Sequence, residues 1–225
     1  NILTPSHGSW VLLGQVITDL ALTPDQPLAK NCGDCVRCID ACPTGAIVAP
    51  YVIDNTRCIS FLTIELKGAM PREMRPLVGD WVFGCDICQD VCPVNRDAPR
   101  TLEPAFRQRH DFAAPQLLPL LALGDEGFQE RFRNSPVKRA KRGGLQRNVC
   151  VALGNIGDRA AVPTLTRVLE TAEPLVRLHA AWALGRIGGA SARTALETAL
   201  DREEEPSVVE EIELSLADMA ASATP

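Results

Sequence analysis

Eight of the nine cysteines in this chain lie in two runs with the spacing of iron–sulfur ligands. They are Cys32, Cys35, Cys38 and Cys42 in the first run and Cys58, Cys85, Cys88 and Cys92 in the second, with a proline after Cys42 and after Cys92. A [4Fe–4S] cluster needs four thiolates that converge on one point, and a C-x2-C-x2-C turn supplies three of them from one loop. The fourth cysteine of such a run ligates the other cluster in two-cluster ferredoxins. We therefore predict two [4Fe–4S] clusters, one held by Cys32, Cys35, Cys38 and Cys92 and the other by Cys42, Cys58, Cys85 and Cys88.

Other roles for these cysteines fit the sequence less well. A disulfide framework is typical of small secreted domains, whereas this chain has 225 residues, no signal-like start and an odd number of cysteines. Pairs of C-x2-C would also satisfy zinc, but eight thiols in this order, with both runs ending in Cys-Pro, favour iron–sulfur clusters. Cys58 is the least regular ligand, because a long segment separates it from Cys85 and breaks the usual C-x2-C-x2-C run. Cys150 lies in an apolar helical stretch and is predicted to be a small buried hydrophobe.

The composition is that of an ordinary soluble protein. Hydrophobic residues make up 46% of the chain and charged residues 23%, and the length allows one or two domains with a sizeable core. No apolar run reaches the roughly 18 residues of a membrane-spanning helix, since Gln15 and Asp19 interrupt residues 10–22. Cluster thiolates without an export signal predict a location in the reducing cytoplasm.

Charge is segregated along the chain, although the net charge is only −5. Residues 201–213 carry seven acids and a single base. Residues 134–150 carry no acid and five cations, which are Lys138, Arg139, Lys141, Arg142 and Arg147. Clustered Lys and Arg neutralise phosphates through counterion release, and helix N-termini favour anions. The five cations are therefore a candidate nucleic-acid site, and a solvated charged face explains them equally well.

Four regions follow one another, and they are residues 1–30, a cysteine module over 31–96, a proline-containing connector over 97–134 and a helical repeat domain over 135–225. In the cysteine module we expect irregular loops, short helices after Cys38 and Cys88, and a helix that starts at Cys58 and is capped by Gly68. In the connector, short helical pieces are expected. The predicted fold is mainly α with irregular loops, a bacterial ferredoxin-like module with two [4Fe–4S] clusters followed by a HEAT-like α-helical repeat domain.

The repeat is visible in the sequence itself. The motif ALGNIGD at residues 152–158 recurs as ALGRIGG at residues 183–189, and apolar positions around the two copies match at the same offset. Each unit is predicted to be a helix that ends at Leu-Gly-x-Ile-Gly, a turn and a second helix. Such helix pairs cannot bury their apolar faces alone and must stack, as in HEAT solenoids. Residues 206–219 are predicted to be the helix that closes the stack, with its acidic face in solvent.

Several stretches, in the same order along the chain, resemble the epoxyqueuosine reductase family. They span about residues 8 to 190 and read GSWVLLGQVITDL, NCGDCVRCIDACPTGAI, RCISFLTIELKG, GDWVFGCDICQDVCPVNR and SPVKRAKRGGLQRNVCVALGN. The cysteine runs alone occur in many ferredoxin-type proteins, but their combination with Cys58-Ile-Ser and a repeat tail that opens in a basic segment is much more specific. The resemblance implies a cobalamin-dependent enzyme that reduces the epoxide of epoxyqueuosine in the tRNA anticodon loop to the alkene of queuosine, with the clusters passing electrons to the corrinoid cobalt.

The resemblance also implies partners and further site residues. The partners would be a tRNA with a queuosine-type anticodon and an electron donor of the flavodoxin or ferredoxin type, with no membrane and with the protein as a monomer. The family match assigns the five cations to RNA binding. It places Ser60 near the corrinoid, where a packing role is the alternative, and Asp86 near it too, where an ordinary turn or cap role is the alternative.

One departure limits what the resemblance implies. In the family, a larger N-terminal domain precedes this region and supplies most of the corrinoid pocket and the proton-donating carboxylic acid, which neither Asp19 nor Asp40 matches. We therefore expect this chain to be the C-terminal part of such an enzyme, inactive alone, with residues 8–16 and 58–66 as one wall of the corrinoid site and no catalytic residue assigned. The alternative is a stand-alone ferredoxin-type electron-transfer protein whose helical repeat tail binds a protein partner.

Overall fold

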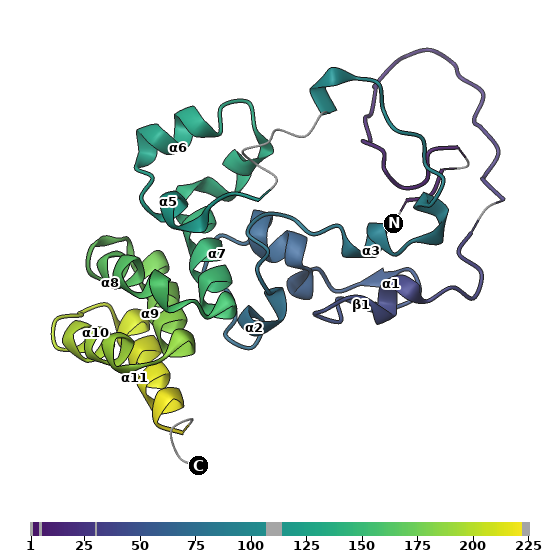
Figure 1. Ribbon diagram of the computed structural model, residues 1–225. Helices are drawn as coiled ribbons and strands as arrows, with labels where there is room; N and C mark the ends of the chain where they lie inside the picture. Colours follow the sequence, from purple (N-terminus) through teal and green to yellow (C-terminus); the bar gives the residue numbers. More distant parts are fainter. Residues whose placement is uncertain (1, 5, 30, 107–113, 222–225) are drawn as a thin grey trace.

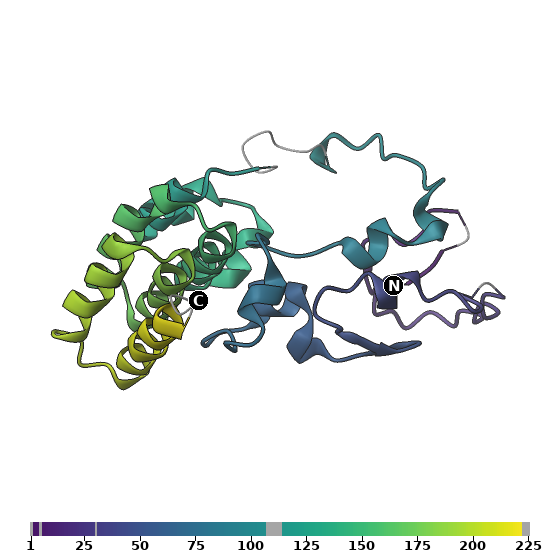
Figure 2. The same ribbon diagram turned by 60° about the horizontal axis from the view of Figure 1, so that its bottom comes forward.

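The structure, a computed structural model, describes residues 2–4, 6–29, 31–106 and 114–221. Its α-helices are α1 (Arg37–Asp40), α2 (Arg75–Val78), α3 (Ile87–Asp90), α5 (Leu117–Leu121), α6 (Asp125–Arg131), α7 (Lys141–Ile156), α8 (Val162–Thr171), α9 (Pro174–Ile187), α10 (Ala190–Leu200) and α11 (Pro206–Ala221). Shorter turns are the 3-10 helices η1 (Asn55–Arg57), η3 (Pro93–Asn95), η4 (Pro104–Phe106), η5 (Pro136–Ala140) and η6 (Arg159–Ala161) and the π-helix η2 (Phe61–Glu65). The cysteine module lies at one end of the molecule and the long helices at the other, as Figure 1 and Figure 2 show from two directions.

The cysteine module is built from irregular loops and very short elements, as predicted. Strands β1 (Ile47–Ala49) and β2 (Val52–Ile53) form an antiparallel hairpin between the two cysteine runs. The helix predicted to follow Cys58 forms, but it is a π-helical turn that ends at Glu65. Leu66 is already extended, with φ −62° and ψ 124°, so Gly68 is not its cap. Such π-helical turns are rare and occur frequently at functional sites.

The repeat domain has the predicted helix pairs. Helix α7 packs against α9, and α9 packs in turn against α8, α10 and α11. Helices α7 and α9 end where the repeated motif predicts. Their caps, Gly157 and Gly188, have φ values of 74° and 71°, a conformation that glycine adopts without steric cost. The second glycine of each motif therefore terminates its helix.

The first glycine of each motif lets two helices approach closely. A β-carbon placed on Gly154 of α7 would lie 2.7 Å from a ring atom of Trp182 in α9. One placed on Gly185, its equivalent in α9, would lie 2.7 Å from the β-carbon of Ser215 in α11. Both distances are shorter than van der Waals contact, so only glycine fits. The repeat in sequence is thus a repeat of helix crossings, which is the packing rule of a solenoid.

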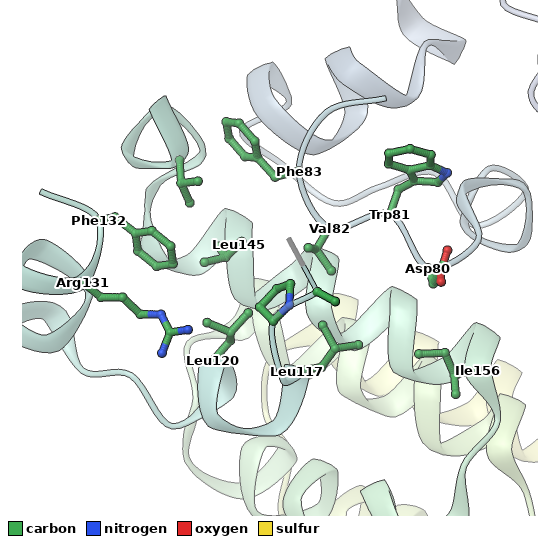
Figure 3. Close-up of a pocket in the computed structure, with 13 residues that line it drawn as sticks. Asp80, Trp81, Val82, Phe83, Leu117, Leu120, Arg131, Phe132, Leu145 and Ile156 are labelled. Atoms are coloured by element: carbon green, nitrogen blue, oxygen red, sulfur yellow. The ribbon is translucent and has the colours of Figure 1, made fainter. Parts of the chain in front are cut away.

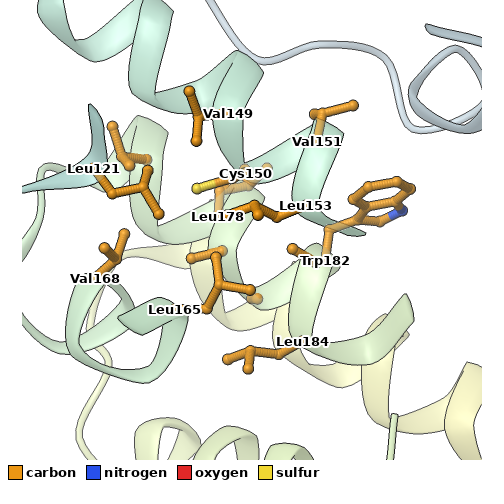
Figure 4. Close-up of a cluster of buried hydrophobic side chains, with 14 of the residues drawn as sticks. Leu121, Val149, Cys150, Val151, Leu153, Leu165, Val168, Leu178, Trp182 and Leu184 are labelled. Carbon is orange, nitrogen blue, oxygen red and sulfur yellow. The ribbon is translucent and has the colours of Figure 1, made fainter. Parts of the chain in front are cut away.

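A continuous apolar core fills the space between these helices (Figure 4). Leu165, Leu184 and Leu196 are fully buried in it. Cys150 is also fully buried, as predicted, and burial raises the pKa of its thiol far above the ordinary value. This cysteine therefore packs as a hydrophobe. None of the helices in the described part of the chain is long and apolar enough to cross a membrane.

The closing helix α11 differs from the prediction in one respect. Its acidic face is only partly in solvent, because Glu211 is 5% exposed. The Glu211 carboxylate accepts a hydrogen bond from Arg72 at 2.9 Å and lies 2.8 Å from Arg75. Both arginines belong to the segment after the π-helix, so this acid joins the end of the repeat domain to the cysteine module.

Candidate iron–sulfur and nucleic-acid sites

The two cysteine runs have the same backbone geometry at equivalent positions. Val36 and Asp86, the residues before α1 and α3, have φ/ψ of −118°/9° and −114°/10°. Cys38 and Cys88 are each the second residue of the helix that follows, and the two helices contact each other. A pair of equivalent loops that face each other is the arrangement that the shared-ligand pattern of a two-cluster ferredoxin requires.

The second cysteine run lacks a cysteine at the position equivalent to Cys32 of the first run, and Cys58 lies close to the loop that contains this position. The residue equivalent to Cys32 in the second run is Val82, which has no thiol. Cys58 directly precedes the turn that contains Ser60, and the Ser60 hydroxyl bonds both backbone groups of Cys85. It donates to the Cys85 carbonyl at 3.1 Å and accepts from the Cys85 N–H at 3.0 Å. The π-helical turn therefore brings Cys58 to the side of Cys85.

The thiol pKa values of Cys85 and Cys88 reflect burial and neighbouring cysteines of both runs. Burial raises the pKa of Cys85, and the negative charges of Cys58 and Cys42 raise it further. Burial likewise raises the pKa of Cys88, with added contributions from Cys85, Cys58 and Cys38 of the first predicted set. Mutual repulsion of this kind acts only between close thiolates, and a bound cation or cluster removes it.

Cys42 has a hydrogen-bonded sulfur. Burial raises the pKa of this thiol, but hydrogen bonds from the Thr44 side chain and from the backbone N–H of Ala46, at 3.3 Å from the sulfur, lower it below the ordinary value. Donors that point at a sulfur stabilise its thiolate form. Hydrogen bonds of this kind also tune iron–sulfur clusters. The chemistry at Cys42 therefore fits a cluster ligand.

The first predicted ligand set, Cys32, Cys35, Cys38 and Cys92, is more exposed to solvent than the second. Cys32 and Cys35 are exposed, and the N–H of Cys35 donates to the carbonyl of Cys32 at 3.1 Å in a tight turn. Cys92 lines a cavity of about 730 Å³ together with residues of α1, the helix that carries Cys38. Cys92 therefore lies beside the first run and not only beside its own. No three Cys, His, Asp or Glu side chains of the described residues surround a point where a single metal ion would sit, whereas the ligands of a four-iron cluster each bind a separate iron.

The residues predicted near the corrinoid are not all in one place. Asp86 lines a cavity of about 610 Å³ with residues 9–12 and Gln89. Asn95 holds that N-terminal stretch in place, accepting from the Ser9 N–H at 2.6 Å and donating to its hydroxyl at 2.8 Å. Ser60 is not among the residues that line this cavity, and its hydroxyl is engaged by Cys85. The structure thus brings residues 9–12 together with Asp86.

Arg147 requires a correction to the predicted RNA-binding set. Its side chain is fully buried. The guanidinium donates to the carbonyls of Leu62, Leu66 and Gly68 at 2.7 to 2.8 Å and to the side chain of Asn148. Burial lowers the pKa of Arg147 to about 10. A side chain in this position cannot reach a phosphate and instead caps the carbonyl end of the π-helical turn.

The other four cations lie at the start of α7 and just before it. Lys141 and Arg139 are exposed, and Lys138 and Arg142 are half-buried. Arg139 forms an ion pair with Glu65 at 2.6 Å, and Arg142 forms one with Asp125 at 2.6 Å. Surface ion pairs of this kind contribute roughly 0–1 kcal/mol, so a phosphate can compete for either arginine.

Sequence reasoning missed a set of buried polar residues in the repeat helices. Asn148 and Asn155 of α7 each donate to two backbone carbonyls of residues 63–82. His179 of α9 is fully buried and accepts the N–H of Met70 at 3.1 Å. The available signal was a polar residue inside an otherwise apolar helical run, because such a residue needs a hydrogen-bond partner.

A further cavity of about 690 Å³ lies between the loop that precedes Cys85 and the helices α5, α6 and α7. Figure 3 shows its apolar lining, which includes Trp81, Phe83 and Phe132, and the side chain of Arg131 at its edge. The buried Nε of Arg131 has no hydrogen-bond partner among the described residues. None of the residues predicted from sequence to bind a ligand lines this cavity.

The cysteine module and the stacked helix pairs define a two-cluster iron–sulfur protein with a HEAT-repeat domain. Residues 31–95 match the 4Fe-4S double cluster binding domain, and residues 138–217 match HEAT repeats. The chain is 40% identical over 222 residues to an epoxyqueuosine reductase of Bacillus subtilis and 43% identical over 185 residues to that of Escherichia coli, covering 98% and 82% of this chain and 57% and 49% of those proteins. An uncharacterized protein of Geobacillus stearothermophilus is 39% identical, with 91% of this chain and 95% of that protein covered.

Solved structures give the same result. The epoxyqueuosine reductase of Bacillus subtilis superposes with a TM-score of 0.92 at 39% identity, covering 97% of this chain and 59% of that one. An epoxyqueuosine reductase crystallised with an epoxyqueuosine-modified tRNA stem loop superposes with a TM-score of 0.83 at 39% identity, covering 88% and 53%. The chain belongs to the epoxyqueuosine reductase family. It spans about half the length of the curated family members it matches.

Proposed function

We propose that this chain is the electron-transfer and RNA-binding part of an epoxyqueuosine reductase, which converts epoxyqueuosine in tRNA to queuosine. The observation that carries the proposal is the convergence of the two cysteine runs in a chain of this family. The relative solved with a modified tRNA stem loop supports tRNA as the partner. The reaction takes place on tRNA, so we also propose that the protein works in the cytoplasm.

The eight cysteines are proposed to hold two [4Fe–4S] clusters, with Cys32, Cys35, Cys38 and Cys92 in one set and Cys42, Cys58, Cys85 and Cys88 in the other. Such clusters supply one-electron transfer when bound. The exposed positions of Cys32 and Cys35 favour the first set as the entry point for electrons from a flavodoxin- or ferredoxin-type donor. The raised pKa values of the more buried thiols Cys85 and Cys88 favour the second set as the inner one.

Opening an epoxide to an alkene needs two electrons and protonation of the leaving oxygen, and bound cobalamin supplies the two-electron centre. We propose that this chain contributes only one wall of the cobalamin site. Residues 9–12 and Asp86 line a cavity, and the Ser60 hydroxyl bonds the backbone of Cys85, the residue before Asp86. The extended segment after residue 10 exposes apolar side chains, with Leu12 82% and Val16 89% exposed, as expected of a surface that packs against a further domain.

Four cations remain for phosphate binding after the correction at Arg147, and they are Lys138, Arg139, Lys141 and Arg142. They precede or open α7, the first repeat helix, near the start of the proposed repeat domain 135–225, which follows the proposed regions 1–30, 31–96 and 97–134. We propose a monomer that binds the anticodon stem loop along this basic edge. Residues 107–113 of the connector lie outside the described residues.

The test is a comparison of three measurements on the anaerobically reconstituted chain. About eight iron and eight sulfide per chain are expected from two clusters. A tRNA anticodon stem loop should bind with strong salt dependence. Conversion of epoxyqueuosine should occur with cobalamin and a strong reductant only when the cobalamin-binding part of the family is supplied. Two clusters without RNA binding would favour the stand-alone electron-transfer protein, and full turnover by this chain alone would show that the corrinoid pocket lies within it.

A further inference from the structure

Asn148 joins two segments that each lead to a predicted cluster ligand. It is fully buried in α7. Its amide nitrogen donates to the carbonyl of Thr63 at 2.7 Å and to the carbonyl of Val82 at 2.9 Å. Thr63 lies in the π-helical turn that follows Cys58, and Val82 lies in the loop that leads to Cys85. One side chain of the repeat domain therefore ties these two segments to each other.

The orientation of this amide is fixed by its neighbour. The Asn148 oxygen accepts two hydrogen bonds from the Arg147 guanidinium, at 3.0 and 2.8 Å. Because the guanidinium carries only donors, the amide oxygen must face it and the NH₂ group must face the two carbonyls. Rotation of the amide would bring its NH₂ against the guanidinium and leave both carbonyls without a donor.

A second layer of hydrogen bonds carries the link to the cysteines. The Thr63 hydroxyl donates to the carbonyl of Ile59 at 2.7 Å and accepts from the N–H of Gly84 at 3.0 Å. The Ser60 hydroxyl bonds both backbone groups of Cys85. The Thr63, Ser60 and Asn148 side chains thus all bond the turn after Cys58 to the loop that leads to Cys85. The separation of Cys58 and Cys85 depends on these three side chains.

We propose that Asn148 is a positioning residue for the cluster held by Cys42, Cys58, Cys85 and Cys88, and that it sets the reduction potential of this cluster alone. The inference rests on the cluster assignment of the proposed function. The potential of an iron–sulfur cluster depends on the hydrogen bonds to its sulfurs and on its exposure to solvent. Both change if the π-helical turn and the loop before Cys85 move apart. The hydrogen bonds of Asn148 in the described part of the chain do not lead to the exposed loop of Cys32 and Cys35.

The same helix provides a matched control. Asn155 lies two turns further along α7, and its amide nitrogen donates to the carbonyls of Arg75 and Gly79, both at 2.8 Å. Those carbonyls belong to α2 and its cap, a segment that carries no predicted cluster ligand. Asn148 and Asn155 therefore make the same kind of double contact to the same module, and only the former leads to cysteines.

The experiment compares Asn148→Asp with Asn155→Asp in the reconstituted chain. Each change replaces an NH₂ donor by an oxygen of the same size and sets it against two carbonyls, so both variants should lose thermal stability. Redox titration followed by EPR should show a shifted midpoint potential and a changed signal for one cluster in Asn148→Asp only. Loss of the same signal in Cys58→Ser identifies the affected cluster. Unchanged potentials in Asn148→Asp, or equal shifts of both clusters, would overturn the proposal.

A second variant keeps the test decisive if Asn148→Asp does not fold. Thr63→Val preserves shape and removes the acceptor for the Gly84 N–H, so it should shift the potential of the same cluster, and an unshifted potential would refute the link. The iron content of the parent chain distinguishes a failure of the proposed function from a failure of the positioning role. Fewer than two clusters in the parent would count against the proposed function, whereas two clusters with a silent Asn148→Asp would refute the positioning role alone.

Discussion

Replacement of the buried Arg147 by methionine should destabilise the protein, and the size of the loss follows from two opposed effects. The change removes the donors of three backbone carbonyls, those of Leu62, Leu66 and Gly68, and of the buried Asn148 amide oxygen. A buried acceptor left without a partner costs roughly 1–3 kcal/mol, which gives about 4–12 kcal/mol in total for four acceptors. The methionine side chain is of similar length and apolar, so the cavity left behind is small.

The opposing effect is relief from burying a charge. Burial lowers the pKa of Arg147 well below the ordinary arginine value, to about 10, and one pKa unit corresponds to about 1.4 kcal/mol, so the buried charge costs on the order of 3 kcal/mol. The net loss expected for Arg147→Met, from the middle of that range, is therefore about 5 kcal/mol. For a protein of this size, 1 kcal/mol shifts Tm by about 2–4 °C, so Tm should fall by about 10–20 °C.

The measurement is the Tm of the reconstituted variant by circular dichroism, with Arg167→Met as the control. Arg167 is an exposed arginine of α8, and its substitution should change stability by no more than about 0.5 kcal/mol. A fall for Arg147→Met no larger than that of the control would show that the carbonyls find other donors, and it would refute the capping role assigned to this side chain.

Three further outcomes are expected. Cys58→Ser should lose about half of the iron and leave one cluster's EPR signal intact, and retention of both signals would assign the fourth ligand elsewhere. Joint reversal of Arg139 and Lys141 to Glu should weaken binding of the tRNA stem loop and reduce the slope of log K against log salt, while Glu65→Gln, which frees Arg139, should strengthen binding. Unchanged binding in both variants would place the RNA on another surface. Burial lowers the pKa of His179 well below 6.5, so below pH 6.5 the unfolded chain takes up a proton that the folded chain does not. Stability should therefore fall with decreasing pH from about 6.5 down to the folded pKa, by up to about 1.4 kcal/mol per pH unit. In His179→Gln this part of the pH dependence of Tm should be absent, and an unchanged dependence would assign it to other groups.

The repeat domain could be predicted closely because glycines at fixed positions determine where its helices pack and where they end. The glycines of the two ALG-x-IG motifs mark both the helix crossings and the helix ends, and these recur with the sequence period. The two-cluster module could be predicted for a similar reason, since cysteine spacing is set by the cluster. What spacing could not give was the position of Cys58, which depends on a π-helical turn between the two runs.

The misassignment of Arg147 has a different cause. Charge counted along the sequence, and not around the helix, groups this residue with the cations that precede it. Ala140, Gly144, Val151 and Gly154 lie at helical spacing from Arg147, and all are buried. Every residue from Gly144 to Gly154 is buried, so this cation lies in a stretch of α7 that has no solvent-exposed face. A buried cation in such a stretch must be hydrogen-bonded, but which carbonyls it bonds is determined by a segment much earlier in the chain, which no local pattern reveals.

These polar contacts explain how an irregular module is held in a defined shape. Residues 62–84 contain only a π-helical turn, one turn of α-helix and loops, so many of their backbone groups have no partner in regular structure. Buried backbone groups must nevertheless be satisfied. Arg147, Asn148, Asn155 and His179 each bind backbone groups of this segment from the repeat helices. The HEAT-like helices thus supply the hydrogen bonds that a sheet or a longer helix would otherwise provide, and the segment that carries the proposed ligands Cys58 and Cys85 takes its shape from the same helices whose basic end is proposed to bind RNA.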